Sequence, residues 1–229
     1  RGQVQDDPLI TASLQDNIDM MITTLSEESF KKDPQGKQTY EEFTKLMTNK
    51  QDEQKRSPIM WVAYVNFYDR QIIKSKEEKR LVAAKLLLEK GADIGLKDEH
   101  DWTALSWASW TGFPTLVSLF IEKGADLNIT DLKGQTPLMI ASIRSNDEVV
   151  RILLEKGADR EIKNSEGKNA LDFAQEYLNR YPERKSNYEN IISSLQTVVK
   201  VEEPKPAEEP QAAEEEKPAT EVPVEQKAE

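Results

Sequence analysis

The sequence predicts an all-α fold in which short helical units of one repeated pattern stack into a solenoid. Two patterns recur in phase, and their equivalent residues lie 33 positions apart, as Gly91, Gly124 and Gly157 do. The first pattern ends in Gly-Ala-Asp and occupies residues 87–93, 120–126 and 153–159. The second occupies residues 103–108, 136–141 and 169–174. Two patterns kept in phase over three copies make the repeat the folding unit.

Each unit is predicted to run turn, helix, turn, helix. Gly124 ends an apolar run with helical spacing, and a helix most often stops where glycine can adopt a positive φ. Thr136 and Pro137 are typical of a helix start, because a threonine hydroxyl caps free N–H groups and proline is tolerated in the first turn. Such a unit cannot bury its apolar face alone, so neighbouring units must stack to form one continuous core.

The 33-residue period and the phrase Thr-Pro-Leu-x-x-Ala resemble the ankyrin repeat family over about residues 53–199. The resemblance implies a solenoid of helix-turn-helix units with β-turn fingers between them. The family usually places a histidine after Thr-Pro-Leu, but this chain has Met60, Ser106, Met139 and Asp172 there. Hydrogen bonds of that histidine between neighbouring turns are therefore missing or replaced, and we expect somewhat looser fingers.

The repeat register divides the chain into six segments. They are a degenerate first repeat with a helical extension (1–52), a second repeat with an insertion (53–97), a third (98–130) and a fourth repeat (131–163), a C-terminal capping repeat (164–199) and a tail (200–229). Within the first segment we expect helices at 17–25 and 39–47. A terminal repeat is atypical because one of its faces meets water.

The second repeat is 13 residues longer than the period, because Thr103 follows Ser57 by 46 positions. The surplus lies within residues 66–80. We expect a lengthened first helix, a solvated charged loop at 74–80, and a second helix from about Glu77 to Lys90. Insertions in repeat proteins map to loops, often on the binding face. A surface insertion with no role is the equal alternative.

The C-terminal tail is predicted to be disordered. Residues 201–229 contain ten Glu, three Lys and five Pro, and they carry seven of the eleven net negative charges of the chain. So few apolar residues cannot offset the entropy of ordering. The acidity argues against nucleic acid as a partner, because phosphates require clustered Lys and Arg.

Compartment is indicated only indirectly. The chain has no cysteine, which excludes disulfides, and no apolar run approaches the roughly 20 residues of a membrane span. The start at Arg1 and the lack of cysteine favour an exported, periplasmic bacterial protein with its leader removed, with a cytoplasmic protein as the alternative. A monomer is expected.

The sequence shows no site for catalysis, a metal or a cofactor, and we expect none. His100 is the only histidine, and no glycine-rich phosphate loop occurs. Asp93, Asp126 and Asp159 belong to the repeated pattern and are expected to bond the local backbone in their turns.

The resemblance places ligand contacts at the finger tips and on the exposed, concave side of the first helices. Transferred by register, the candidate partner-binding residues are Tyr64, His100, Trp102, Trp110, Thr111, Lys133, Gln135, Ile143 and Arg144. Exposed Trp, Tyr and Arg are typical of interface hot spots. Trp61 and Trp107 are expected to pack in the core. Trp102 and Trp110 have an alternative role as a local core covered by Phe67 and Tyr68 of the insertion.

Together these patterns predict a non-enzymatic protein–protein interaction module that binds a protein partner of unknown identity on the concave face and turn tips. The alternative is an architectural or tethering protein, in which the solenoid is a rigid body and the acidic tail is a spacer or attachment arm. An enzymatic role would need a nucleophile with a base beside it, and the sequence offers no candidate.

Overall fold

The computed structural model describes residues 8–9, 12, 18–25, 39–64 and 70–197. The chain divides into two units, Arg1–Val198 and Val199–Glu229. The second unit contains the predicted acidic tail, which lies outside the described residues. Phe67 and Tyr68 also lie outside them.

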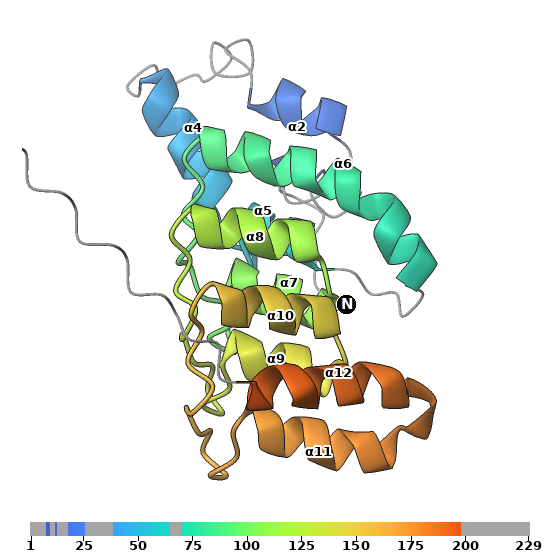
Figure 1. Ribbon diagram of the computed structural model, residues 1–229. Coiled ribbons are helices and arrows are strands. Elements are labelled where there is room, and N and C mark those ends of the chain that lie inside the picture. Colours follow the sequence, from blue (N-terminus) through green and yellow to red (C-terminus); the bar gives the residue numbers. More distant parts are fainter. Residues whose placement is uncertain (1–7, 10–11, 13–17, 26–38, 65–69, 198–229) are drawn as a thin grey trace, which may run out of the picture. The chain divides into compact units, whose positions relative to one another are not determined.

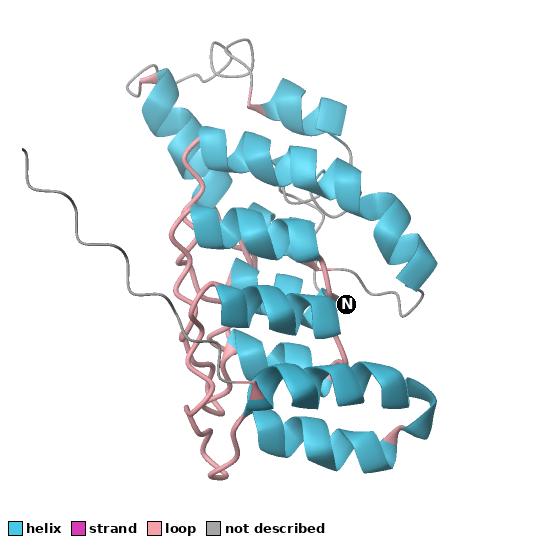
Figure 2. Ribbon diagram, viewed as in Figure 1, coloured by secondary structure: helices cyan, strands magenta, loops and turns pink. Residues whose placement is uncertain are grey.

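The described residues form helices and loops without strands, which confirms the all-α prediction (Figures 1 and 2). The helices are α2 (Ile18–Thr24), α4 (Tyr40–Asn49), α5 (Pro58–Ala63), α6 (Arg70–Glu89), α7 (Ala104–Thr111), α8 (Pro114–Glu122), α9 (Pro137–Ile143), α10 (Asp147–Glu155), α11 (Ala170–Arg180), the 3-10 turn Pro182–Arg184 and α12 (Lys185–Gln196).

Helices α5 to α12 form pairs that stack in chain order (Figure 1). The first helices of the pairs, α5, α7, α9 and α11, contact one another in sequence, and the second helices, α6, α8, α10 and α12, do the same. Leu105, Leu116, Leu138 and Leu153 are buried between the two rows. Ala108 and its equivalents at 141 and 174 are fully buried, because a methyl side chain lets neighbouring first helices approach closely.

The predicted helix starts and stops are confirmed. The Thr103 and Thr136 hydroxyls and the Asn169 amide oxygen each accept a hydrogen bond from the backbone N–H three residues later. Gly124 has a φ of 88°, and the equivalent glycines at 91 and 157 have φ near 90° as well. Positive φ at these positions turns the chain out of the second helix into the next finger.

Each finger is a turn built around one acidic or amide side chain. Asp98 Oδ1 accepts hydrogen bonds from the N–H groups of His100 and Trp102, and Asp52, Asp131 and Asn164 do the same in their own fingers. Neighbouring fingers are also linked by backbone bonds, such as Glu99 N–H to Gln54 O at 3.0 Å. The fingers are thus linked without that histidine, and the looser fingers stay a prediction.

The aspartates of the Gly-Ala-Asp pattern bond the local backbone, as predicted. The Oδ1 atoms of Asp93, Asp126 and Asp159 each accept the N–H two residues later, at 2.8 to 2.9 Å. These carboxylates are therefore structural parts of the turn.

The predicted form of the insertion is wrong in two respects. Helix α5 is not lengthened but ends at Ala63, and the stretch 74–80 is helical because α6 runs from Arg70 to Glu89. Lys, Glu and Arg are good helix formers, so a charged stretch can continue a helix. Arg80, predicted to be solvated, is only 3% exposed.

Arg80 holds α6 against the end of α5. Its Nη1 donates to the carbonyl oxygens of Trp61, Val62 and Tyr64 at 3.0, 2.6 and 2.7 Å. These carbonyls lie at the C-terminal end of a six-residue helix, where no further turn supplies N–H donors. The buried guanidinium therefore replaces the missing helix turn.

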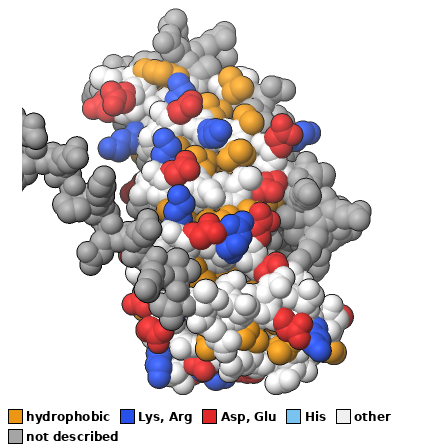
Figure 3. Space-filling view, in the orientation of Figure 1, with side chains coloured by type: hydrophobic (Ala, Val, Ile, Leu, Met, Phe, Trp, Pro, Cys, Tyr) orange, Lys and Arg blue, Asp and Glu red, His pale blue; other side chains and the backbone are white. Residues whose placement is uncertain are grey.

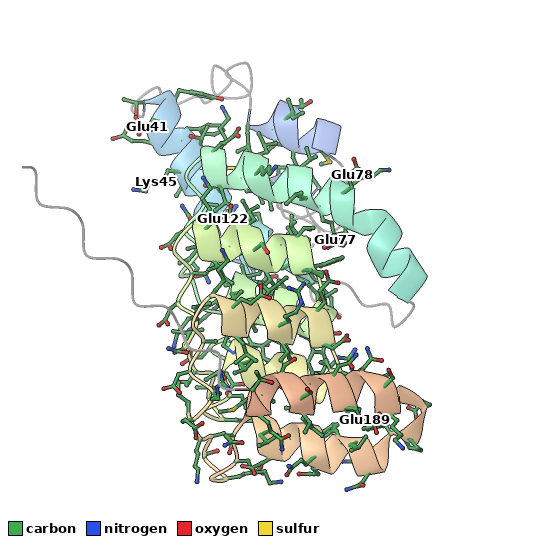
Figure 4. The ribbon with its side chains drawn as sticks, viewed as in Figure 1. Glu41, Lys45, Glu77, Glu78, Glu122 and Glu189 are labelled. Carbon is green, nitrogen blue, oxygen red and sulfur yellow. The ribbon has the colours of Figure 1, made fainter. Side chains whose placement is uncertain are left out.

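Glu77, also on α6, caps the neighbouring helix α8 (Figure 4). The Thr115 N–H and hydroxyl both donate to Glu77 Oε1, at 3.0 and 2.7 Å. The residue at the N-cap of α8, Phe113, has no side-chain oxygen, so a carboxylate from the preceding repeat supplies the acceptor. The charged insertion thus helps to join repeats two and three.

Described residues that precede the second predicted repeat contribute to the same core. Leu9, Ala12, Met21 and Leu25 are buried, and α2 contacts α6. The helix predicted at 39–47 is confirmed as α4, which starts with a capping box at Thr39.

A buried tyrosine links the last helix of the stack, α12, to the end of α9. Tyr188 on α12 is fully buried, and its hydroxyl donates to Ile143 O at the end of α9, at 3.0 Å. Burial raises the pKa of Tyr188 above 10, because the phenolate is poorly solvated there.

Tyr188→Phe is expected to cost about 1 kcal/mol at neutral pH through the lost hydrogen bond. Above pH 10 the tyrosine of the unfolded chain ionises before that of the folded chain. The stability due to the raised pKa is therefore present below pH 10 and is lost as the pH rises through the folded-state pKa. Urea unfolding from pH 7 to 11 should show the gap between wild type and Tyr188→Phe narrowing above pH 10. A constant gap would contradict this assignment.

Candidate functional site

Five aromatic side chains form one continuous row across repeats two and three, which we call the aromatic strip. The rings of Trp61, Tyr64, Trp107, Trp102 and Trp110 follow one another with centroid separations of 5.6, 4.9, 4.6 and 5.6 Å. Trp61 and Trp107 are buried, as predicted, while the other three are half-buried. Edge and tilted ring contacts of this kind add about 0.5–1.5 kcal/mol each beyond simple burial.

The fingers hold three of the four tryptophans of this strip by their indole N–H groups. Trp61 donates to Asp52 Oδ2 at 2.9 Å, and Trp107 donates to Asp98 Oδ2 at 3.0 Å. In the next repeat Ile140 occupies the equivalent position, which leaves the Asp131 Oδ2 atom free of an indole from its own repeat. Trp102 donates to that oxygen from the neighbouring finger at 2.9 Å. Each carboxylate therefore organises a turn with one oxygen and orients a tryptophan with the other.

A guanidinium group lies over the rings at each end of the strip. The Arg56 Cζ atom is 4.9 Å from the ring centroid of Trp61 and 5.0 Å from that of Trp107. The Arg144 Cζ atom is 4.2 Å from the ring of Trp110, and Arg144 Nε donates to Trp110 O. Cation–π contacts at such sites contribute about 0.5–1 kcal/mol each.

The structure brings four of the predicted site residues into this one cluster: Tyr64, Trp102, Trp110 and Arg144. His100 and Lys133 are exposed on finger tips, and Gln135 is half-buried in the fourth finger. Ile143 is half-buried and packs against the core. Whether any of these residues touches a partner stays a prediction.

The placement of Thr111 on the outward face is wrong. Thr111 is only 7% exposed, and its hydroxyl donates to Ala63 O at 2.9 Å. The end of each first helix packs against the preceding first helix, so the residue that follows Trp110 points into that contact. Thr111 therefore links repeats two and three and is not part of the proposed binding surface.

Two other residues extend this surface, and the repeat register places both of them in the fingers. Arg56 follows the tip of the second finger and lies on the strip, as described above. Leu132 is at the tip of the fourth finger and is 69% exposed, the largest value among the exposed large hydrophobic residues of the described chain. Their positions in the repeat register were the only available signal, since nothing in the sequence shows what surrounds them.

The alternative in which Phe67 and Tyr68 cover Trp102 and Trp110 depends on residues outside the described ones. Both roles of Trp102 and Trp110 therefore stay predictions: a covered local core, and a surface that binds a partner.

The part of the chain that the structure describes offers little for chemistry. No three side chains of His, Cys, Asp or Glu gather there as a metal site requires. A polar hollow between α10 and α12 is lined by Asp147, Glu148, Arg151, Asn190, Ser193 and Ser194. Both oxygens of Asp147 accept amide hydrogen bonds, from Asn187 and Asn190, so this carboxylate joins the two helices.

Within the described ranges, no helix combines the length and the apolar character that crossing a bilayer requires.

Comparison with known families gives two overlapping matches. A family model described as ankyrin repeats in three copies matches residues 35–131, and one described as ankyrin repeats in many copies matches residues 121–174. A search of curated proteins gave no match.

Proposed function

The chain belongs to the ankyrin repeat family, and from that premise we propose that it is a non-enzymatic module that binds a protein partner through repeats two to four. Ankyrin repeats are generally protein–protein interaction modules. The proposed contact surface consists of the half-buried rings of the aromatic strip and the two arginines at its ends, Arg56 and Arg144. It also includes the tips of the third and fourth fingers, which carry His100, Leu132 and Lys133.

The observation that carries this proposal is the run of half-buried aromatic rings beside the exposed Leu132. Trp, Tyr and Arg dominate interface hot spots because they supply large contact areas and keep a polar group for specificity. Tyr64 packs on Trp107, and Trp102 packs on Trp110, so these side chains lose little further entropy when a partner binds them.

The opposite row of helices has a different character. Figure 3 shows the face over the second helices, where positive, negative and apolar side chains are interspersed. Such mixing is typical of a solvated surface without a single partner. This contrast supports placing the partner on the fingers and the first helices.

We expect the double variant Trp110→Ala, Leu132→Ser to weaken partner binding by about 2 kcal/mol or more, the loss typical of a hot-spot residue. Partners captured from lysate by the full chain would be quantified by mass spectrometry, and the affinity of the strongest would then be measured with purified protein. Val82→Ser is the matched control, because Val82 is 48% exposed on α6 and lies outside the proposed surface.

Thermal unfolding should show that both variants remain folded. If the double variant and the control capture the same partners with equal affinity, the surface is wrongly placed. If deletion of residues 201–229 alone abolishes function while the double variant is silent, the architectural role is correct instead.

A further inference from the structure

We propose that the partner segment presents a carboxylate to Arg56 and an apolar side chain to Trp102 and Trp110, a choice of partner chemistry that rests on the proposed function. The occupant is thus an acidic protein segment with a large apolar residue beside its Asp or Glu. Four features of the described residues lead to this choice.

First, the Arg56 guanidinium has hydrogen-bonding capacity to spare. Its Nε atom is buried and has no hydrogen-bond partner. No carboxylate among the described residues forms an ion pair with it, and its recorded side-chain contacts are with the rings of Trp61, Tyr64 and Trp107. A guanidinium carries five N–H donors, and aromatic rings satisfy none of them with a full hydrogen bond.

Second, the carboxylates of the neighbouring fingers are already occupied. Asp52 Oδ1 accepts the N–H groups of Gln54 and Arg56, and its Oδ2 accepts the indole of Trp61. Asp98 is occupied in the same way by two backbone N–H groups and Trp107. Both carboxylates are thus engaged within their own fingers, and neither forms an ion pair with Arg56.

The fifth repeat shows the contrasting arrangement. Lys168 pairs with Glu176 at 2.7 Å and with Glu166 at 3.6 Å. Its hydrogen bond to Glu176 raises the pKa of the Lys168 ammonium above the usual value. In that repeat the cation has a carboxylate partner, whereas in the second repeat no carboxylate of the described residues pairs with Arg56.

Third, the ring platform favours a carboxylate over other acceptors. The rings of Trp61 and Trp107 pack against the guanidinium, and its fork of N–H donors matches the two oxygens of a carboxylate. Because the group is held before binding, less entropy is lost on binding. A nucleic acid also offers anionic oxygens, but a chain with a net charge of −11 repels a polyanion more than a single carboxylate.

Fourth, the apolar part of the site adjoins Arg56. Trp107 lies under Arg56, and its ring centroid is 4.6 Å from that of Trp102. The ring centroids of Trp102 and Trp110 are 5.6 Å apart. Trp102 and Trp110 are half-buried, so each keeps part of its ring surface for a ligand. An acidic residue on Arg56 would therefore have an apolar neighbour within a few residues along an extended segment.

The test uses a displayed library of random peptides, selected separately on the full-length wild type, Arg56→Gln, Arg56→Lys and Arg151→Gln. Arg151 is the matched control, an exposed arginine on α10 that pairs with Glu155. Wild type and Arg151→Gln should enrich peptides with Asp or Glu at a constant spacing from a large apolar residue. Arg56→Gln should lose that acidic preference, and Arg56→Lys should keep it only weakly, because an ammonium lacks the fork.

The strongest peptide from the wild-type selection would then be synthesised with its acidic residue intact and with the corresponding amide. The amide peptide should bind wild type about tenfold more weakly. Arg56→Gln should bind both peptides with similar affinity, because the double change removes the interaction from both sides.

Each other outcome overturns the inference in a recognisable way. Peptides that need Trp110 and Leu132 but show no acidic preference would overturn the carboxylate while leaving the proposed function in place. Acidic peptides that ignore Arg56, Trp110 and Leu132, or no enriched peptide at all, would overturn both. A labelled oligothymidine that binds in an Arg56-dependent manner more tightly than the peptides would show that the anion is a phosphate.

Discussion

Replacing Arg80 by alanine is expected to lower the free energy of unfolding by about 3 kcal/mol, since each buried carbonyl left unsatisfied costs about 1–3 kcal/mol. Three carbonyl oxygens, those of Trp61, Val62 and Tyr64, accept from the Arg80 guanidinium. Arg80 is 3% exposed, so water does not readily take its place. Urea unfolding followed by circular dichroism measures the change.

Two further variants make the Arg80 prediction specific. Arg80→Lys should recover part of the loss, because an ammonium can donate to the same carbonyl oxygens but its side chain reaches less far than the Nη1 atom that makes all three bonds. Arg151→Ala removes an exposed arginine and should change stability by less than about 0.5 kcal/mol. If Arg80→Ala were as stable as Arg151→Ala, Arg80 would not be what holds α6 to the end of α5.

The variant Gly112→Ala is expected to cost about 2–4 kcal/mol through backbone strain and lost hydrogen bonds. Gly112 ends α7 with a φ of 84°, and a Cβ atom there would lie 2.6 Å from Asn146 Oδ1. The Asn146 amide donates to Ser109 O and Trp110 O at 2.8 and 3.2 Å. Moving it aside would break both bonds and release the end of the helix that carries Trp110.

Gly124→Ala separates the two contributions to the Gly112 result. Gly124 also has a positive φ, 88°, but a Cβ there meets nothing within 4 Å. Gly124→Ala should therefore lower the free energy of unfolding only through backbone strain at positive φ, by about 1–2 kcal/mol. Equal thermal midpoints for Gly112→Ala and Gly124→Ala would show that the contact with Asn146 carries no stability. Because Asn146 bonds the carbonyl of Trp110, we also expect Gly112→Ala to perturb the aromatic strip.

The repeat pattern was sufficient to predict the helix starts, the helix stops and the turns of the stack. Helix starts at Thr103 and Thr136, positive φ at the repeated glycines and the turn role of Asp126 depend on contacts within a few residues of each position. Local geometry of this kind is visible in the sequence. The burial of Trp107 followed as well, because its position in the period belongs to the core.

The insertion was harder to predict because its conformation depends on a distant contact. The stretch 74–80 has the composition of a solvated loop and also of a helix. The helical conformation places Arg80 against the end of α5, where it donates to carbonyl oxygens that lie 16 or more residues away in the sequence. The position of Thr111 was misjudged for a related reason, since its hydroxyl bonds Ala63 in the preceding repeat.

In the candidate site, too, some features could be predicted from the sequence and others depend on distant contacts. The sequence placed Tyr64, Trp102, Trp110 and Arg144 on one surface, because repeats of constant length put equivalent positions side by side. It could not show that Arg56 lies on Trp61 and Trp107 or that the nearby aspartates are already occupied.

By itself the sequence determined the architecture, since the period, the helix caps and the glycine stops are local signals repeated in phase. Only the tertiary structure decided which charges are solvated, buried or left without a carboxylate partner. The physical reason is that the state of a charge depends on all the groups around it in space. For Arg56 and Arg80 those groups come from aromatic rings and helix ends that the chain brings together only when the repeats stack.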